Sequence, residues 1–136
     1  MRRRVYSFIC VLLIVIGICG TAYALDVKTA TITSTTNSSI KLLYCAEIQW
    51  ETLFYWSVTG SVATQNVSSN YNHKSSVTYF LYNNGAAIKA KSTSTSKTEA
   101  ILVFSSSSGD KLRSIHSLIN PNTETAVLSY TNTMSD

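Results

Sequence analysis

Polar and hydrophobic residues alternate along the stretch from Ile40 to Val58. In an extended chain successive side chains point to opposite faces, so the charges fall on one face and the large apolar residues on the other. The apolar face holds Ile40, Leu42, Tyr44, Ala46, Ile48, Trp50, Phe54, Trp56 and Val58. Helical spacing also fits part of the run, but β-branched and aromatic residues favour a strand. Because most strands have about 5–6 residues, we expect a break between Glu47 and Glu51.

The pair Asn84-Gly85 stands between two alternating runs and predicts a β-hairpin over 77–93. Both central residues of a two-residue hairpin turn take positive φ, which asparagine and glycine tolerate. A turn of this length sets the register of the two strands. The predicted pairs are Leu81 with Ile88, Tyr79 with Ala90, and Val77 with Ser92 on one face, and Phe80 with Lys89 and Thr78 with Lys91 on the other.

Shorter runs predict further strands at 26–35, 61–67, 99–104 and 125–131. The run at 99–104 is almost continuously apolar, which is typical of a strand covered on both faces or of one whose second face lies against a neighbour. The segment 111–119 fits neither a strand nor a helix cleanly, and a short helix is one interpretation of it. Seven or eight short strands joined by turns predict an all-β chain that forms a single-domain antiparallel β-sandwich.

The first 24 residues differ from the rest of the chain. Three arginines precede an apolar run from Val5 to Gly20, and the small-residue pattern Ala22-Tyr23-Ala24 comes next. This order is that of a secretory signal peptide. The apolar run is shorter than the about 20 residues that a membrane-spanning helix needs. We therefore expect cleavage after Ala24, a mature domain of residues 25–136 without a transmembrane span, and an extracellular or cell-envelope location.

Cleavage would remove most of the excess positive charge. Without the arginines at positions 2–4, eight of the 11 basic residues remain against seven acidic ones, and the formal charge falls from +4 to +1. So small a charge does not indicate a nucleic-acid partner. The remaining cluster of Lys89, Lys91 and Lys97 is typical of an edge strand that resists pairing with another sheet.

Cys45 is the single cysteine after residue 24, so the predicted mature chain has no internal disulfide. We expect it to be buried as a small hydrophobic residue, with pairing between two chains as an alternative. A thiol enzyme that uses Cys45 with His73 or His116 is a third hypothesis, but the nearby Glu47 opposes a thiolate. The same residues lack the close spacing of a metal motif, so we expect neither a metal nor another cofactor.

The loop from Ser68 to Ser76 is the longest polar segment that contains an aromatic residue. Tyr71, His73 and Lys74 lie in it, and a tyrosine offers a ligand both an apolar face and a polar tip. Binding residues are frequent on surface loops. We expect these three residues to contact an unknown protein or a cell-envelope polymer. The leading hypothesis is thus a secreted, non-catalytic protein that acts by surface binding, whether in adhesion, envelope binding or contact with a partner.

Four short motifs stand in the middle of the chain: Gly60-Ser61-Val62, Ser69-x-Tyr71-x-His73, Ser75-Ser76 and Asn83-Asn84-Gly85. Through these motifs the segment 57–85 resembles the lactococcin-type secreted bacteriocins. The resemblance implies a small exported β-sandwich that acts as a toxin on the envelope of related bacteria.

Overall fold

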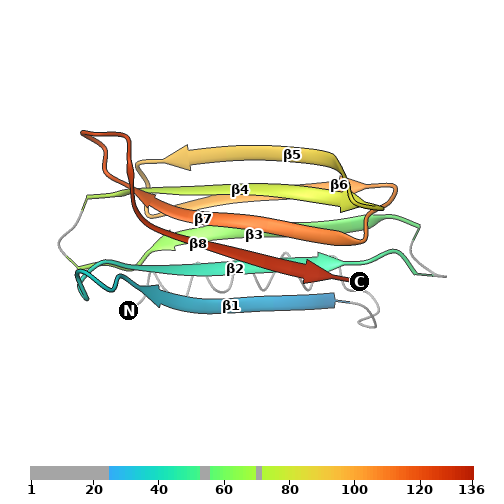
Figure 1. Ribbon diagram of the computed structural model, residues 1–136, viewed down its shortest axis with the longest axis horizontal. Coiled ribbons are helices and arrows are strands. Elements are labelled where there is room, and N and C mark those ends of the chain that lie inside the picture. Colours follow the sequence, from blue (N-terminus) through green and yellow to red (C-terminus); the bar gives the residue numbers. More distant parts are fainter. Residues whose placement is uncertain (1–24, 53–55, 70–71) are drawn as a thin grey trace.

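The computed structural model describes residues 25–52, 56–69 and 72–136, and the predicted signal peptide, residues 1–24, lies outside them. The described residues form eight strands and no helix. The strands are β1 (Leu25–Thr33), β2 (Lys41–Gln49), β3 (Val58–Asn66), β4 (Lys74–Asn83), β5 (Ala86–Thr95), β6 (Glu99–Ser106), β7 (Lys111–Ile119) and β8 (Ala126–Ser135). The turn at 34–40 lies at the end of the molecule where β3 ends and β4 begins (Figure 1).

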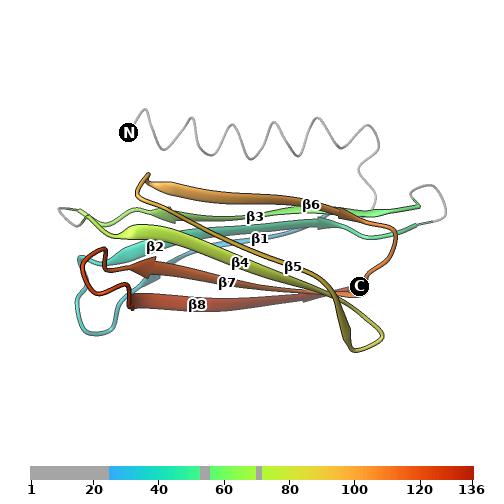
Figure 2. The ribbon, with the colours of Figure 1, turned by 90° about the horizontal axis from the view of Figure 1, so that it is seen from above.

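The strands form two antiparallel sheets that pack face to face. Sheet A has the order β1-β2-β3-β6, and sheet B has the order β5-β4-β7-β8. Figure 2 shows the two layers, with β3 and β6 in one and β7 and β8 in the other. The prediction of an all-β antiparallel sandwich is confirmed.

The core lies between the sheets, where each strand places alternate side chains. In β2 and just beyond it Leu42, Tyr44, Ala46, Ile48 and Trp50 are buried, as the alternation from Ile40 predicted. Sheet B faces them with Val77, Tyr79, Leu81, Leu112 and Leu118. The rings of Tyr79 and Phe104 stack across the two sheets with centroids 4.6 Å apart. Trp50 also has a polar partner at the rim, because its Nε1 donates to Asp26 Oδ2 at 2.7 Å.

The prediction that both tryptophans share the buried face is wrong for Trp56. Strand β2 ends at Gln49, inside the stretch where we expected a break. Trp56 then precedes β3, and 82% of its surface is exposed. Side chains alternate between two faces only while the chain stays extended. An interruption between two strands therefore ends the alternation, and residues beyond it need not lie on the same face as those before it.

Strands β4 and β5 form the predicted hairpin, but its predicted register is wrong. Asn84 and Gly85 occupy the turn with φ of 50° and 81°. Leu81 nevertheless pairs with Lys89, because a β-bulge leaves Ile88 as an extra residue on β5. The other predicted pairs shift in the same way, so Phe80 lies opposite an alanine rather than a lysine.

A lysine spans the gap between the sheets at each open edge of the sandwich. On one side Lys28 of β1 donates to the Thr133 carbonyl of β8 at 2.9 Å. On the other side the bulge turns Lys89 of β5 inward, and its Nζ donates to the Ser105 carbonyl of β6 at 2.6 Å. Inward-pointing charges on edge strands discourage pairing with another chain. The prediction of an edge strand is confirmed for Lys89 and Lys91, whereas Lys97 lies after β5, between it and β6.

The interpretation of 99–104 as a strand covered on both faces is wrong. Strand β6 is an edge strand, and its side chains alternate between the core and the outside. Leu102 and Phe104 are buried, whereas Ile101 and Val103 are 37% and 57% exposed. Because the outer face of the strand also carries apolar side chains, the sequence shows no alternation of polar and apolar residues there.

The segment 111–119 is strand β7, and the helical interpretation is wrong. Leu112, Ser114, His116 and Leu118 alternate into the core with no exposed surface. Two of these four residues are polar, so a search for alternating apolar residues misses the strand. Their burial is tolerated because their polar atoms bond to one another and to sheet A.

Candidate functional site

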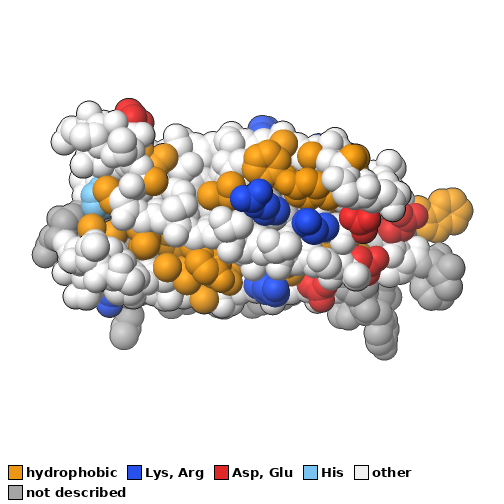
Figure 3. Space-filling model, viewed as in Figure 1, with side chains coloured by type: hydrophobic (Ala, Val, Ile, Leu, Met, Phe, Trp, Pro, Cys, Tyr) orange, Lys and Arg blue, Asp and Glu red, His pale blue; other side chains and the backbone are white. Residues whose placement is uncertain are grey.

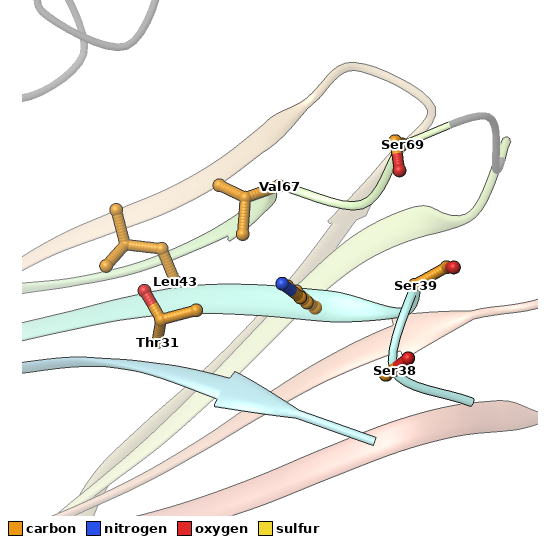
Figure 4. A pocket seen from close by; sticks show the side chains of 7 residues that line it. Thr31, Ser38, Ser39, Leu43, Val67 and Ser69 are labelled. Atoms are coloured by element: carbon orange, nitrogen blue, oxygen red, sulfur yellow. The ribbon is translucent and has the colours of Figure 1, made fainter. Parts of the chain in front are cut away.

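A hollow of about 660 Å³ opens at one end of the outer face of sheet A. We call it the Lys41 pocket, and it is lined by Thr31, Ser38, Ser39, Lys41, Leu43, Val67 and Ser69. Leu43 points away from the core, because its neighbours Leu42 and Tyr44 fill the interior. Figure 4 shows the three serines toward one end of the pocket, and Thr31 and Leu43 toward the other. The volume lies within the about 300–1,000 Å³ typical of small-molecule sites.

One wall of the pocket is the turn between β1 and β2. The Ser34 amide donates to the Ile40 carbonyl at 2.9 Å, and the Ile40 amide donates to the Asn37 carbonyl at 3.0 Å. Asn37 Oδ1 accepts from the Ser39 amide at 3.0 Å, which is the local bond of an Asx turn. These bonds hold Ser38 and Ser39 in place, although both are exposed.

The opposite wall is the segment after β3. The Lys41 amide donates to Ser68 Oγ at 2.9 Å, and the Ser68 hydroxyl donates to the Lys41 carbonyl at 3.1 Å. The Val67 amide reaches the same carbonyl at 3.1 Å. These three bonds tie the chain after β3 to the start of β2. They keep Val67 and Ser69 beside Lys41.

The lining of the Lys41 pocket combines three kinds of contact. Its serine and threonine hydroxyls can both donate and accept hydrogen bonds. Leu43 and Val67 give an apolar surface, and Lys41 supplies one positive charge. The described ion pair joins Lys74 to Glu124, so no described carboxylate neutralises Lys41. This arrangement suits a ligand with many hydroxyls, an apolar side and an acidic group.

The residues predicted to bind from the loop do not line this pocket. Tyr71 lies outside the described residues. His73 directly precedes β4, and Lys74 is its first residue. The Lys74 ammonium pairs with Glu124 at 2.6 Å. Ser69, from the same loop, does line the pocket. The binding role of Tyr71, His73 and Lys74 stays a prediction.

Lys41 is the residue that the sequence did not reveal. It comes after a turn and opens a strand, which places it at the surface, but many lysines fit that description. The pocket exists because three segments meet: the end of β1, the turn to β2 and the chain after β3. Their neighbourhood depends on the strand order, which the sequence pattern did not predict.

Cys45 lies half-buried on the outer face of sheet A, next to Glu47. Its thiol donates to Glu47 Oε1 at 3.6 Å, and the Ser61 hydroxyl donates to Glu47 Oε2 at 3.4 Å. Burial, together with the neighbouring Glu47, raises the pKa of Cys45 to about 12. Burial also raises the pKa of the Glu47 carboxyl. A thiol that stays protonated is a weak nucleophile, so this geometry gives the thiol-enzyme hypothesis no support.

Cys45 is expected to react with a disulfide reagent about 1,000-fold more slowly in the folded protein than in denaturant, at the same pH. The pKa rises from 9.0 to about 12, and each unit lowers the thiolate fraction tenfold. The rates are measured by absorbance in a chain that carries Cys10→Ser and Cys19→Ser. The same chain with Cys45→Ser serves as the blank. Native labelling within tenfold of the denatured rate would show that the thiol is ionised and accessible.

His116 is the other candidate catalytic side chain, and the fold places it inside the core. Its Nδ1 lies 2.9 Å from Thr64 Oγ1, and its Nε2 lies 2.8 Å from Ser114 Oγ. The ring packs against Tyr44 with centroids 5.0 Å apart. Burial lowers the pKa of His116 to about 4, so the ring is neutral at pH 7. Within the described ranges no three side chains gather as metal ligands.

Comparison with known proteins gives this chain no relatives. No family model, no curated protein and no solved structure matches it. The resemblance of residues 57–85 to lactococcin-type bacteriocins therefore stays a prediction. No helix in the described part of the chain is long and apolar enough to cross a membrane.

Proposed function

We propose that this chain is a secreted, non-catalytic binding protein of the cell surface, and that the Lys41 pocket is its ligand site. The observation that carries the proposal is a hydroxyl-lined hollow whose one cation has no described ion-pair partner. The proposed ligand is a cell-envelope polymer built of sugars and acidic groups. Its hydroxyls would bond to the serines, its acidic group would pair with Lys41, and the apolar side of a ring would rest on Leu43.

The rest of the molecule supports a binding role. A sandwich holds its turns on a rigid scaffold, which is how many proteins present recognition surfaces. The walls of the pocket are held by backbone bonds, so little ordering is required when a ligand binds. Exported binding proteins meet envelope polymers directly after secretion.

A bacteriocin-like toxin is the second candidate function. The 82% exposed side chain of Trp56 favours it, because tryptophan prefers the interface between a membrane and water. Both candidates bind the envelope, and they differ in the effect of binding on the cell. A toxin reduces the viability of related strains when purified protein is added, whereas a binding protein leaves their growth unchanged.

Replacement of Lys41 by glutamate is expected to weaken binding to isolated envelope material at least tenfold. The substitution puts a negative charge where the acidic group of the ligand would sit, and like charges repel. Co-sedimentation at physiological salt measures the effect. Lys97→Glu is the matched control, because Lys97 is also exposed but lies outside the pocket.

Two results together would support the pocket as the site: loss of binding in Lys41→Glu, and binding within twofold of the parent in Lys97→Glu. Both variants should melt within about 2 °C of the parent, since surface changes usually cost under about 0.5 kcal/mol. Equal binding by the parent and Lys41→Glu would remove the pocket as the ligand site. An equal loss of envelope binding in both variants would show that binding depends on the net charge of the protein and not on the pocket.

A further inference from the structure

The two sheets differ in charge. The four strands of sheet B contain five lysine and arginine residues and no aspartate or glutamate. The four strands of sheet A contain two lysines and three acidic residues. The net charge of the whole chain does not reveal that the charges are distributed unequally between the two sheets. On the outer face of sheet B the exposed cations without a described ion pair are Lys111 and Arg113, because Lys89 and Lys91 pair with the core residues Leu81 and Tyr79, and Lys74 pairs with Glu124.

Aromatic side chains lie beside the cations in the middle of this outer face. Phe80 and Tyr82 of β4 point outward, because Tyr79 and Leu81 are buried in the core. Their ring centroids are 6.5 Å apart, and the rings are inclined by 37°. Both side chains are half-buried, so part of each stays accessible.

Each of the two rings has a cation on the neighbouring strand. In the register of β4 with β7, Phe80 pairs with Arg113 and Tyr82 pairs with Lys111. The Lys111 Nζ lies 5.0 Å from the centre of the Tyr82 ring. Lys111 and Arg113 are exposed, and the described ion pair involves neither. Figure 3 shows Lys and Arg side chains beside hydrophobic ones in the middle of this face, with several acidic side chains toward one end of the molecule and another at the opposite end.

Around this group the outer face is rich in hydroxyls. In β4 Thr78 lies two residues before Phe80, and its hydroxyl lies 2.6 Å from that of Ser92 on β5. In β8 Thr133 pairs with Arg113. Ile115 completes the apolar part of the surface, opposite Thr78. The face thus joins flat apolar rings, cations and hydroxyls, with no carboxylate from its own strands.

We propose that this face binds an acidic polysaccharide, with Phe80, Tyr82, Lys111 and Arg113 as its main contacts. The rings would stack on the apolar sides of successive sugars. Arg113 would form paired hydrogen bonds with a carboxylate, and Lys111 would neutralise a second acidic group. Charge complementarity selects an acidic chain over a neutral one. The low overall charge and the small number of exposed cations on this face disfavour a nucleic acid.

This surface is separate from the Lys41 pocket. The pocket opens on the outer face of sheet A, whereas the proposed polysaccharide surface is the outer face of sheet B. The core lies between them. The two sites can therefore be tested independently, and either can fail without the other.

The test uses polygalacturonate as the acidic probe and dextran as the neutral one, at physiological salt and by calorimetry. The parent is expected to bind polygalacturonate and not dextran. Arg113→Gln and Lys111→Gln should each weaken binding at least fivefold. Lys97→Gln removes an equal charge from another surface and should stay within twofold of the parent.

Phe80→Thr tests the role of stacking, because it removes a ring and changes no charge. It should weaken binding at least fivefold with a melting temperature that still shows a folded sandwich. Should this variant fail to fold, the exposed Arg113 and Lys111 still decide the outcome. The proposal is overturned if the parent does not bind polygalacturonate, or if Lys97→Gln loses as much affinity as Arg113→Gln. Tighter binding of a single-stranded oligonucleotide than of polygalacturonate would overturn it in favour of a nucleic-acid partner.

Discussion

Replacement of Gly60 by alanine is expected to lower the free energy of unfolding by about 3 kcal/mol, at the upper end of the usual range for overpacking. Gly60 lies in β3 and is hydrogen-bonded between β2 and β6. A Cβ there would press against the carbonyl oxygen of Glu47 and approach Phe104 Cζ to 2.6 Å. The carbonyl belongs to the sheet backbone, and the Phe104 ring is stacked on Tyr79, so neither can move aside cheaply.

Gly85→Ala is the matched control for Gly60→Ala. A Cβ at Gly85 meets no atom within 4 Å, and its φ of 81° is the only strain. That strain costs about 1 kcal/mol. Urea denaturation of the two variants and the parent gives the comparison. A loss in Gly60→Ala no larger than in Gly85→Ala would show that β3 can move away from its neighbours and that the packing around Phe104 is loose.

Acidification is expected to destabilise the protein through His116, by about 3 kcal/mol between pH 7 and pH 4. The folded pKa of His116 is about 4, below the ordinary value of 6.5, because burial disfavours the charged ring. Between these two values the unfolded chain binds a proton that the folded chain does not. Stability is therefore full above pH 6.5 and falls as the pH drops toward 4. The difference between the folded and unfolded pKa values of His116 determines how much stability is lost.

His116→Gln isolates this contribution, because carboxylates that also titrate are common to both proteins. Glutamine keeps polar atoms near Thr64 and Ser114 but does not titrate in this range. The free energy of unfolding is measured in urea at several pH values. The difference between parent and variant should shrink by about 3 kcal/mol from pH 7 to pH 4. A difference that does not change with pH would show that His116 takes up its proton in the folded state as readily as in the unfolded one.

The sequence predicted the parts of the fold that depend on local pattern. Alternation from Leu42 to Trp50 indicated the buried face of β2, and Asn84-Gly85 indicated the hairpin turn. The bulge at Ile88 had no such signal, because a two-residue turn normally continues into a regular ladder. The burial of His116 depends on a partner from the other sheet, Thr64, and no local sequence pattern shows it. For this reason the sequence left His116 as a candidate catalytic base.

The two proposed binding surfaces required the strand order, which local pattern does not contain. Lys41 becomes part of a pocket only because β1 and the chain after β3 flank the start of β2. Likewise, Phe80 and Arg113 are far apart in the sequence and adjacent only because β4 pairs with β7. The positive character of sheet B emerges when the residues are sorted by sheet.

The central claim is that the protein binds an envelope polymer through the Lys41 pocket, and a chemical-shift titration tests it most directly. The ¹⁵N-labelled protein is titrated with solubilised envelope polymer, and amide shifts are measured residue by residue. The account predicts saturable shifts concentrated at Thr31, at 38–43 and at 67–69, with core amides such as that of Leu112 unchanged. Saturable shifts confined to other parts of the surface, or no shifts at all, would contradict it.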